Sequence, residues 1–249
     1  MSRVCILQSK GLHVKFGGVK AANDVNLNLY EGELASIIGP NGSGKTTFLN
    51  LCTGYVRPNE GEVIFKDKDL TKMPPRDITR LGAVRTFQLP QLFTENTVIQ
   101  NILIALAART GFWSLRWLDR PSLRDEAMEI LSVFGLKTES NRYIHSLPEG
   151  VRKLVDIAVS MALSPTLLLM DEPTSGVSSD EKFEIMDILI PILRERKITA
   201  LLVEHDMELV ERYMDRVIVW NAGQVMADGE PSTILRDERV INEVIGVVK

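Results

Sequence analysis

A glycine-rich stretch near the start of the chain carries a lysine and two threonines at spacings suited to binding phosphate. It reads Gly39-Pro40-Asn41-Gly42-Ser43-Gly44-Lys45-Thr46-Thr47. Glycines let successive backbone N–H groups curl around an anion, because no Cβ blocks the required conformations. Lys45 can reach the β- and γ-phosphates of a nucleotide, and the Thr46 hydroxyl is a ligand for Mg²⁺. The pattern predicts a P-loop that binds a nucleoside triphosphate.

Two carboxylates, Asp171 and Glu172, follow the apolar residues 167–170. Such a run predicts a strand buried on both faces of a parallel sheet. Carboxylates at its end are costly to bury unless they meet cations or take part in a reaction. A Mg²⁺ ion near Thr46 would supply that cation. We therefore expect Asp171 to help hold the ion and Glu172 to polarise the attacking water.

Gln88 and His205 also stand where strands are predicted to end, after residues 83–87 and 198–203. The carboxyl ends of parallel strands meet at one edge of an α/β sheet, where ligands bind. Taken alone, Gln88 is as well explained as an ordinary loop residue. A histidine such as His205 is usually an ordinary surface residue. Here Gln88, Asp171 and His205 follow three predicted strands beside one P-loop, and this arrangement favours a functional role for His205.

The segments around these residues predict an α/β protein. Residues 34–38 predict a buried strand before the P-loop, and residues 48–52 predict a helix after it. That helix would direct the positive end of its dipole at the bound phosphates. Residues 24–30 alternate polar and apolar side chains, as a half-buried antiparallel strand does. Phe16 ends another predicted strand, and its spacing alone favours a place in the core.

Composition limits the remaining possibilities. The chain has 249 residues, of which 45% are hydrophobic and 25% charged, and its net charge is -4. This balance gives no sign of the basic surface that nucleic-acid binding requires. No apolar run approaches the roughly 20 residues of a membrane span, so any membrane role would come through a partner. We expect both cysteines, Cys5 and Cys52, to be buried in a reducing compartment.

One stretch leaves two interpretations open. Residues 110–120 place Trp113 and Trp117, two of the three tryptophans, among basic side chains. They could form the core of a small subdomain, or an aromatic surface that contacts another protein.

With the order P-loop, glutamine, Asp-Glu and histidine, nearly the whole chain resembles the ATPase subunits of ABC transporters. It is most similar to those of importers for branched-chain amino acids and of related amide or urea systems. The stretches that carry this resemblance are Phe16-Gly17-Gly18-Val19-Lys20-Ala21, Val84-Arg85-Thr86-Phe87-Gln88, Leu92-Phe93 with Thr97-Val98, Glu204-His205-Asp206-Met207 and Glu243-Val244-Ile245-Gly246.

The resemblance implies a role for each site residue. Phe16 would stack on the adenine of ATP, which replaces the core interpretation. Gln88 would be the Q-loop glutamine, which senses Mg²⁺ and the γ-phosphate and couples to the membrane subunits. Asp171 would be the Walker B aspartate that helps to hold Mg²⁺, and Glu172 the catalytic glutamate. His205 would be the switch histidine that contacts the γ-phosphate.

The resemblance also implies an architecture and partners. Residues 1–249 would form one ABC ATPase domain: a P-loop NTPase core with a mainly parallel sheet flanked by helices, an N-terminal antiparallel β subdomain, and a helical subdomain inserted at about 89–160. Such ATPases work as head-to-tail dimers on two membrane-spanning permease subunits, and a solute-binding protein completes the importer. The chain would lie on the cytoplasmic face of the inner membrane and bind no nucleic acid.

Two stretches depart from the family pattern. The signature Leu-Ser-Gly-Gly-Gln is replaced by Leu147-Pro148-Glu149-Gly150-Val151, and the D-loop Ser-Ala-Leu-Asp by Ser175-Gly176-Val177-Ser178. An acid near the γ-phosphate would repel it, and proline lacks a backbone N–H donor. We expect a heterodimer with a second ATPase subunit, in which the site built on this P-loop hydrolyses ATP well and the site completed by this signature turns over slowly.

Two alternatives remain. A non-transport ABC ATPase acting on DNA or ribosomes would carry coiled-coil insertions or a second cassette, and this sequence has neither. A regulatory subunit that holds ATP with little hydrolysis would explain the altered signature, but Glu172 and His205 argue against it.

Overall fold

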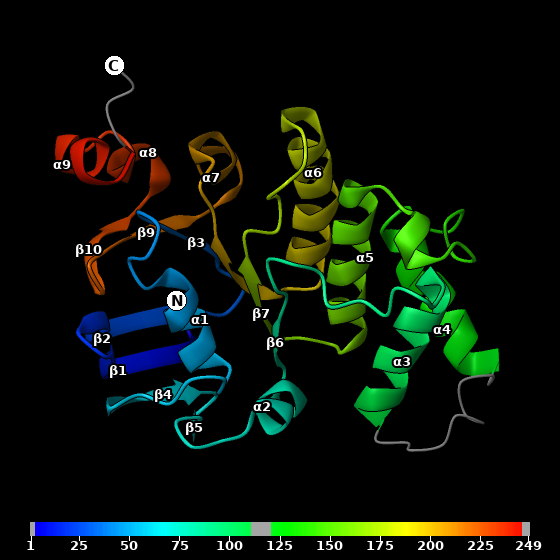
Figure 1. Cartoon of the computed structure of the whole chain (residues 1–249), viewed down its shortest axis with the longest axis horizontal. Helices are drawn as coiled ribbons and strands as arrows, with labels where there is room; N and C mark the ends of the chain where they lie inside the picture. The colour runs from blue at the N-terminus through cyan, green and yellow to red at the C-terminus, as the bar shows by residue number, and fades with distance from the viewer. Residues whose placement is uncertain (1–2, 111–120, 246–249) are drawn as a thin grey trace.

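The computed structural model describes residues 3–110 and 121–245, so the segment with Trp113 and Trp117 lies outside the described residues. The described chain forms two sheets with helices around them (Figure 1). The figure shows the antiparallel sheet at the left of the molecule and a group of helices at the right.

The N-terminal sheet is antiparallel, with strand order β2-β1-β4-β5. Its strands are β1 (Cys5–Phe16), β2 (Val19–Tyr30), β4 (Glu60–Phe65) and β5 (Lys68–Asp69). In β2, Val25, Leu27 and Leu29 are buried while the residues between them are less so, which confirms the predicted half-buried strand. Both β1 and β2 are longer than predicted. The prediction that Cys5 is buried was wrong, because Cys5 is the exposed first residue of β1.

The second sheet has the strand order β10-β9-β3-β8-β7-β6 and is parallel except for the β9–β10 hairpin. Its strands are β3 (Leu34–Ile38), β6 (Ala83–Arg85), β7 (Leu167–Asp171), β8 (Thr199–Val203), β9 (Arg216–Asn221) and β10 (Gln224–Gly229). Every residue of β3, β7 and β8 is buried, as continuous apolar runs predict for a sheet covered on both faces.

Helices pack around this sheet, some against its two faces and some against other helices. They are α1 (Lys45–Cys52), α2 (Pro75–Leu81), α3 (Val98–Thr110), α4 (Pro121–Val133), α5 (Glu149–Ala162), α6 (Ser179–Glu195), α7 (Met207–Tyr213), α8 (Pro231–Ile234), α9 (Glu238–Val240), a 3₁₀ turn (Ile144–Ser146) and a π-turn (Ile241–Ile245). Ile37 of β3 joins a core with Phe48 of α1 and the antiparallel sheet, whereas Ile38 joins a core with α3 to α7. The predicted α/β class and P-loop core are confirmed.

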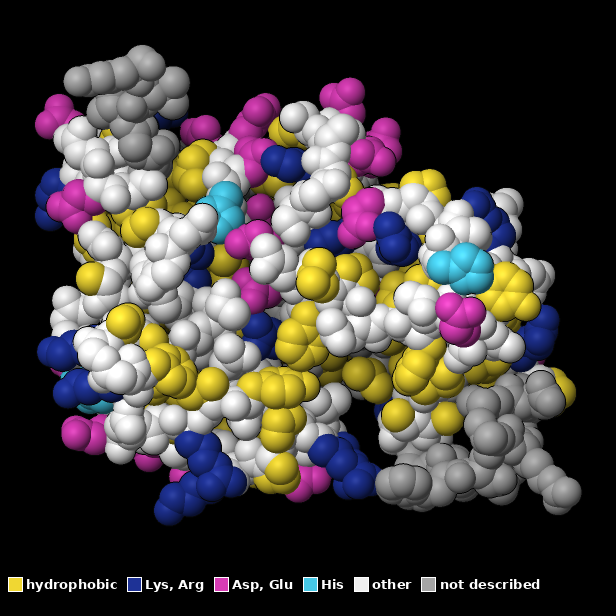
Figure 2. Space-filling view, in the orientation of Figure 1, with side chains coloured by type: hydrophobic (Ala, Val, Ile, Leu, Met, Phe, Trp, Pro, Cys, Tyr) yellow, Lys and Arg dark blue, Asp and Glu magenta, His cyan; other side chains and the backbone are white. Residues whose placement is uncertain are grey.

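The surface in Figure 2 mixes acidic and basic side chains. Hydrophobic side chains gather over the lower middle of this face and over the helices at its right. Two large apolar residues that follow β6, Leu89 and Phe93, are strongly exposed. In the described part of the chain, no helix combines the length and the apolar character needed to cross a membrane.

Candidate nucleotide-binding site

The P-loop connects β3 to α1 and packs tightly against its neighbours. A Cβ on Gly39 would lie 2.0 Å from the carbonyl oxygen of Trp220, and a Cβ on Gly44 would lie 2.0 Å from that of Ala21. Gly44 also has a φ of +110°, which L side chains rarely adopt. Positions 39 and 44 therefore accept only glycine, because β9 and β2 close on the loop.

Within the loop, polar groups are arranged as an anion site requires. The ammonium of Lys45 donates hydrogen bonds to the carbonyl oxygens of Gly39 (2.7 Å) and Pro40 (2.9 Å). Burial lowers the pKa of Lys45, and the nearby carboxylates of Glu172 and Asp171 oppose that shift. The Ser43 hydroxyl is buried and finds no hydrogen-bond partner among the described residues. Phosphate oxygens would satisfy both groups, so the loop fits a nucleotide.

Asp171 ends β7 beside the P-loop. The Thr46 hydroxyl donates to Asp171 Oδ1 at 3.3 Å, and the Arg85 guanidinium donates to Asp171 Oδ2 at 2.9 Å. A second Arg85 nitrogen donates to Asn50 Oδ1 at 2.5 Å. A hydroxyl and a carboxylate beside phosphates are ligands that Mg²⁺ commonly takes in such sites, so these residues fit that ion.

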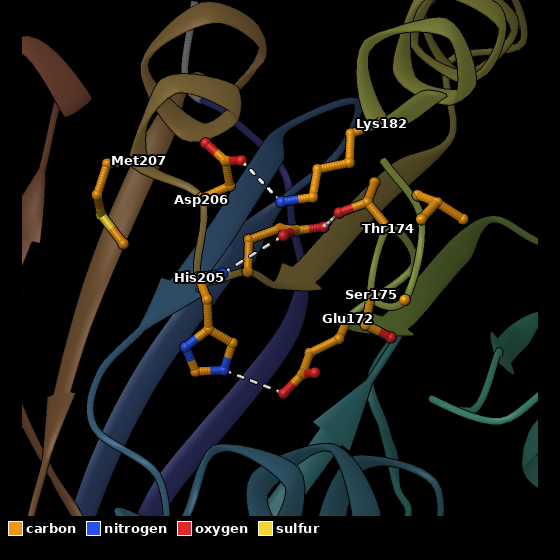
Figure 3. Close-up of a pocket in the computed structure, with 10 residues that line it drawn as sticks. Glu172, Thr174, Ser175, Lys182, His205, Asp206 and Met207 are labelled. Carbon is orange, nitrogen blue, oxygen red and sulfur yellow. Dashed lines mark hydrogen bonds and ion pairs between the residues drawn. The ribbon is translucent and has the colours of Figure 1, made fainter. Parts of the chain in front are cut away.

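Glu172 projects into the site because its backbone turns sharply after β7. Its φ is +50°, a left-handed conformation that is unfavourable for a non-glycine residue. The Gln88 side-chain amide donates to one carboxylate oxygen at 2.9 Å, and His205 Nε2 lies 3.0 Å from the other. Figure 3 shows the His205 ring pointing at this carboxylate. The structure thus brings together Gln88, Glu172 and His205 from the segments that follow β6, β7 and β8.

The approach to Gln88 differs in one detail from the sequence prediction. β6 ends at Arg85, two residues earlier than predicted. The Thr86 N–H still donates to the Leu169 carbonyl at 2.9 Å, and the chain then leaves the sheet. Gln88 therefore extends from a loop, which is the segment that leads across to α3 (Figure 1).

A cavity opens beside Glu172 and His205 (Figure 3). Lys182 pairs with Asp206 on its wall at 3.0 Å. Behind His205, the buried Glu204 accepts a hydrogen bond from the Thr174 hydroxyl at 3.0 Å. Burial raises the pKa of Glu204 to about 7. Glu204 also accepts from the His205 backbone N–H, so it links His205 to Thr174, the residue just before the stretch 175–178.

Phe16 lies at the end of β1 and is 53% exposed, so the core interpretation that spacing favoured was wrong. It pairs with Val19 across the β1–β2 turn. Ala21, a little further along β2, is the residue whose carbonyl packs against Gly44. The exposed ring is therefore on the hairpin that borders the P-loop.

The altered signature lies at the start of α5. Pro148 is the residue that precedes the helix, and Glu149 is in its first turn. The Glu149 carboxylate pairs with Arg152 at 2.7 Å. The repulsion expected from the sequence is thus partly offset, because the acid carries its own counter-charge.

Several residues that build the site were not assigned a role from the sequence. Arg85 is a charged residue in an otherwise apolar strand, and Glu204 directly precedes His205. Both positions could have indicated a role in the site from the sequence alone. Trp220, which supports the P-loop and packs on Phe48 with ring centroids 5.0 Å apart, gave no local signal. Lys153 lies in α5, a segment for which no individual helix was predicted from the sequence.

A P-loop before α1, an Asp-Glu pair at the end of β7 and a histidine after β8 define a nucleotide-binding cassette. The chain matches the ABC transporter family over residues 22–175, which is more than half of its length, and it belongs to this family. ATP-binding subunits of this family are ATPases, and this chain is one of them.

Curated relatives match along the whole chain. It is 39% identical to the high-affinity branched-chain amino acid transport ATP-binding protein LivG of Escherichia coli K12, over 97% of this chain and 98% of the relative. It is 37% identical to the probable LivG protein of Archaeoglobus fulgidus, over 97% of this chain and 95% of that protein.

Solved structures agree with the fold. The ADP conformation of MJ1267, an ATP-binding cassette of an ABC transporter, superposes with a TM-score of 0.86 at 32% identity, covering 96% of this chain and 97% of that one. A dimeric structure of the cassette MJ0796 with ADP and Pi superposes with a TM-score of 0.79 at 27% identity, covering 91% and 99%.

Proposed function

We propose that this chain is the ATP-binding and ATP-hydrolysing subunit of an ABC importer, for branched-chain amino acids or related small polar solutes. The observation that carries the catalytic part is the Glu172 carboxylate, held 2.9 Å from the Gln88 amide and 3.0 Å from His205. Its position beside the Thr46–Asp171 pair is where a water attacking the γ-phosphate would need a base. The solute class follows from the names of the relatives.

Each part of the site then has a task. Residues 39–47 hold the phosphates, Phe16 stacks on adenine, and Thr46, Asp171 and Gln88 hold Mg²⁺. The ion, when bound, neutralises charge on the β- and γ-phosphates. Glu172 orients and polarises the water, and His205 contacts the γ-phosphate. The hydrogen bonds from Gln88 and His205 fix the carboxylate before the substrate arrives, so little reorganisation is needed.

The assembly that we propose has five components. This subunit pairs head to tail with a different ATPase subunit beneath two permease subunits, and a solute-binding protein delivers the solute. The subunit lies on the cytoplasmic face of the inner membrane, attached through the permeases. The helical subdomain at about 89–160 provides the surface that meets them, and exposed Leu89 and Phe93 supply apolar area there.

The two ATP sites of this assembly are unequal. Pro148 cannot donate a backbone N–H, and Val151 replaces a glutamine that could hydrogen-bond a nucleotide. The partner's ATP, which faces this signature, is therefore hydrolysed slowly. The ATP on this chain's P-loop faces the partner's signature and supports most of the turnover.

The test is Glu172→Gln in the purified, assembled transporter. Turnover should fall about 100-fold or more, because the amide cannot accept the proton of the attacking water. The equivalent substitution in the partner ATPase should have the smaller effect. Glu62→Gln serves as the control and should leave turnover unchanged, because Glu62 is a partly exposed residue of β4 that pairs with Lys10. If the partner's substitution alone stops hydrolysis, the assignment of the active site to this P-loop is wrong.

A further inference from the structure

One buried cation, Lys153, connects segments of the site that lie far apart in the sequence. It lies in the second turn of α5 and is only 4% exposed. Its ammonium donates to the Gln88 carbonyl at 2.8 Å and to the Ser175 hydroxyl at 3.1 Å. The Glu172 carbonyl is a third, longer contact at 3.5 Å. Among the described residues, Lys153 is the one side chain of α5 with hydrogen bonds to both Gln88 of the Q-loop and Ser175 of the D-loop.

The environment of Lys153 explains how it can be buried. An ammonium has three donors, and three oxygens surround this one. Burial lowers the pKa of Lys153, whereas the surrounding carboxylates of Glu149, Asp156, Glu172 and Glu204 oppose that shift. The Lys153 ammonium is itself buried, so moving it away from these three oxygens would leave a buried charge without its hydrogen-bond partners.

A second contact fixes the other end of the same loop. Asp156 lies three residues after Lys153, on the same face of α5, and is also buried. Its carboxylate accepts a hydrogen bond from the Gln91 backbone. Helix α5 therefore holds the loop at both Gln88 and Gln91, with a cation at one end and an anion at the other.

We propose that Lys153 is a positioning residue for hydrolysis. By fixing the Gln88 backbone, it holds the side chain that donates to Glu172. By binding Ser175, it ties the D-loop to the same helix. The signature stretch 147–151 begins that helix, so a shift of Gln88 or Ser175 is transmitted to the surface that faces the partner's nucleotide. The contacts of the Lys153 ammonium are with Gln88, Ser175 and Glu172, so we assign it an action through these neighbours. The inference rests on the proposed roles of Gln88 and Glu172.

The test compares Lys153→Met with a matched control in the assembled transporter. Lys153→Met retains the aliphatic stem and removes the donors. We expect kcat to fall about 10- to 100-fold while the KM for ATP changes less than about threefold, because positioning is lost and the P-loop is untouched. Lys153→Gln, which can still donate to the Gln88 carbonyl, should give an intermediate kcat.

Arg109→Met is the control. Arg109 fastens the opposite end of α5 through the Ala162 carbonyl (3.1 Å) and the Ser164 hydroxyl (2.8 Å), and it also pairs with Glu126 of α4 (2.8 Å). Its loss should lower the melting temperature and leave kcat near the wild-type value. Should Lys153→Met change kcat no more than Arg109→Met does, the inference is overturned.

Two further variants separate the possible failures. If Lys153→Met does not assemble, Ser175→Ala removes one partner of the ammonium with little change in volume. Its kcat should fall severalfold at an unchanged KM, and a wild-type kcat would overturn the inference.

Glu172→Gln distinguishes the two proposals. Full turnover in that variant refutes the catalytic assignment, whereas an inactive Glu172→Gln beside a normal Lys153→Met refutes the role of Lys153 alone.

Discussion

The Arg85 guanidinium lies 2.9 Å from the Asp171 carboxylate, and the two side chains are only 4% and 5% exposed. The two carboxylate oxygens are used differently: Oδ2 accepts from Arg85, and Oδ1 accepts from Thr46 at 3.3 Å. Arg85 also lies over the Phe87 ring, 4.9 Å from its centroid. The pair orients the Asp171 carboxylate while Oδ1 remains directed at Thr46 and the proposed ion site.

Removing Arg85 should be costly because it would leave Asp171 as a buried, uncompensated charge. For Arg85→Met we expect the free energy of unfolding to fall by about 3–5 kcal/mol. Denaturant unfolding of the isolated subunit would measure it. Arg80→Met is the matched control, since Arg80 and Asp77 form a 3.6 Å pair with both side chains 51% exposed. Its loss should cost less than about 1 kcal/mol. If both variants lost the same free energy of unfolding, the buried Arg85–Asp171 pair would contribute no more to stability than an exposed pair.

Two glycines of the P-loop should respond very differently to alanine. At Gly44 a Cβ would meet the Ala21 carbonyl at 2.0 Å, whereas at Gly42, with φ +75°, no atom lies within 4 Å. Gly42→Ala should therefore cost about 1 kcal/mol, from the left-handed backbone alone. Gly44→Ala should cost about 3 kcal/mol or more, since β2 must move. Thermal unfolding without nucleotide would separate them, and similar melting temperatures would contradict the packing that we describe.

Stability should depend on pH through Asp156. Burial raises the pKa of its carboxyl from 3.8 to about 6. The folded chain therefore binds this proton more tightly than the unfolded chain does, so ionising Asp156 costs stability. That cost grows as the pH rises from about 4 to about 6 and is constant above.

Asp156→Asn removes this cost while keeping an acceptor for the Gln91 backbone. The variant should be more stable than the wild type by about 1–3 kcal/mol at pH 8, and the difference should shrink towards pH 5. Urea unfolding at the two pH values would measure it. A difference that does not change with pH would assign the effect to packing instead of charge.

Features set by neighbours in the sequence could be predicted, whereas features set by contacts between distant segments could not. Residues 34–38 and 167–170 were predicted as buried strands because a continuous apolar run is a local signal. By contrast, β6 proved to end at Arg85, since the last bond of that strand is made with Leu169 of a neighbouring strand. Spacing also misplaced Phe16, because its exposure depends on what packs around the end of the β1–β2 hairpin.

By itself, the sequence determined the P-loop and the Asp171-Glu172 pair after an apolar run, because each is a short pattern that indicates one chemistry. Only the tertiary structure decided how those residues are held. Arg85 meets Asp171 across 86 positions, and Lys153 meets Gln88 across 65. Such contacts leave no periodicity in the chain. They form only when the sheet has brought its strand ends together and burial has made an unpaired charge too costly to keep.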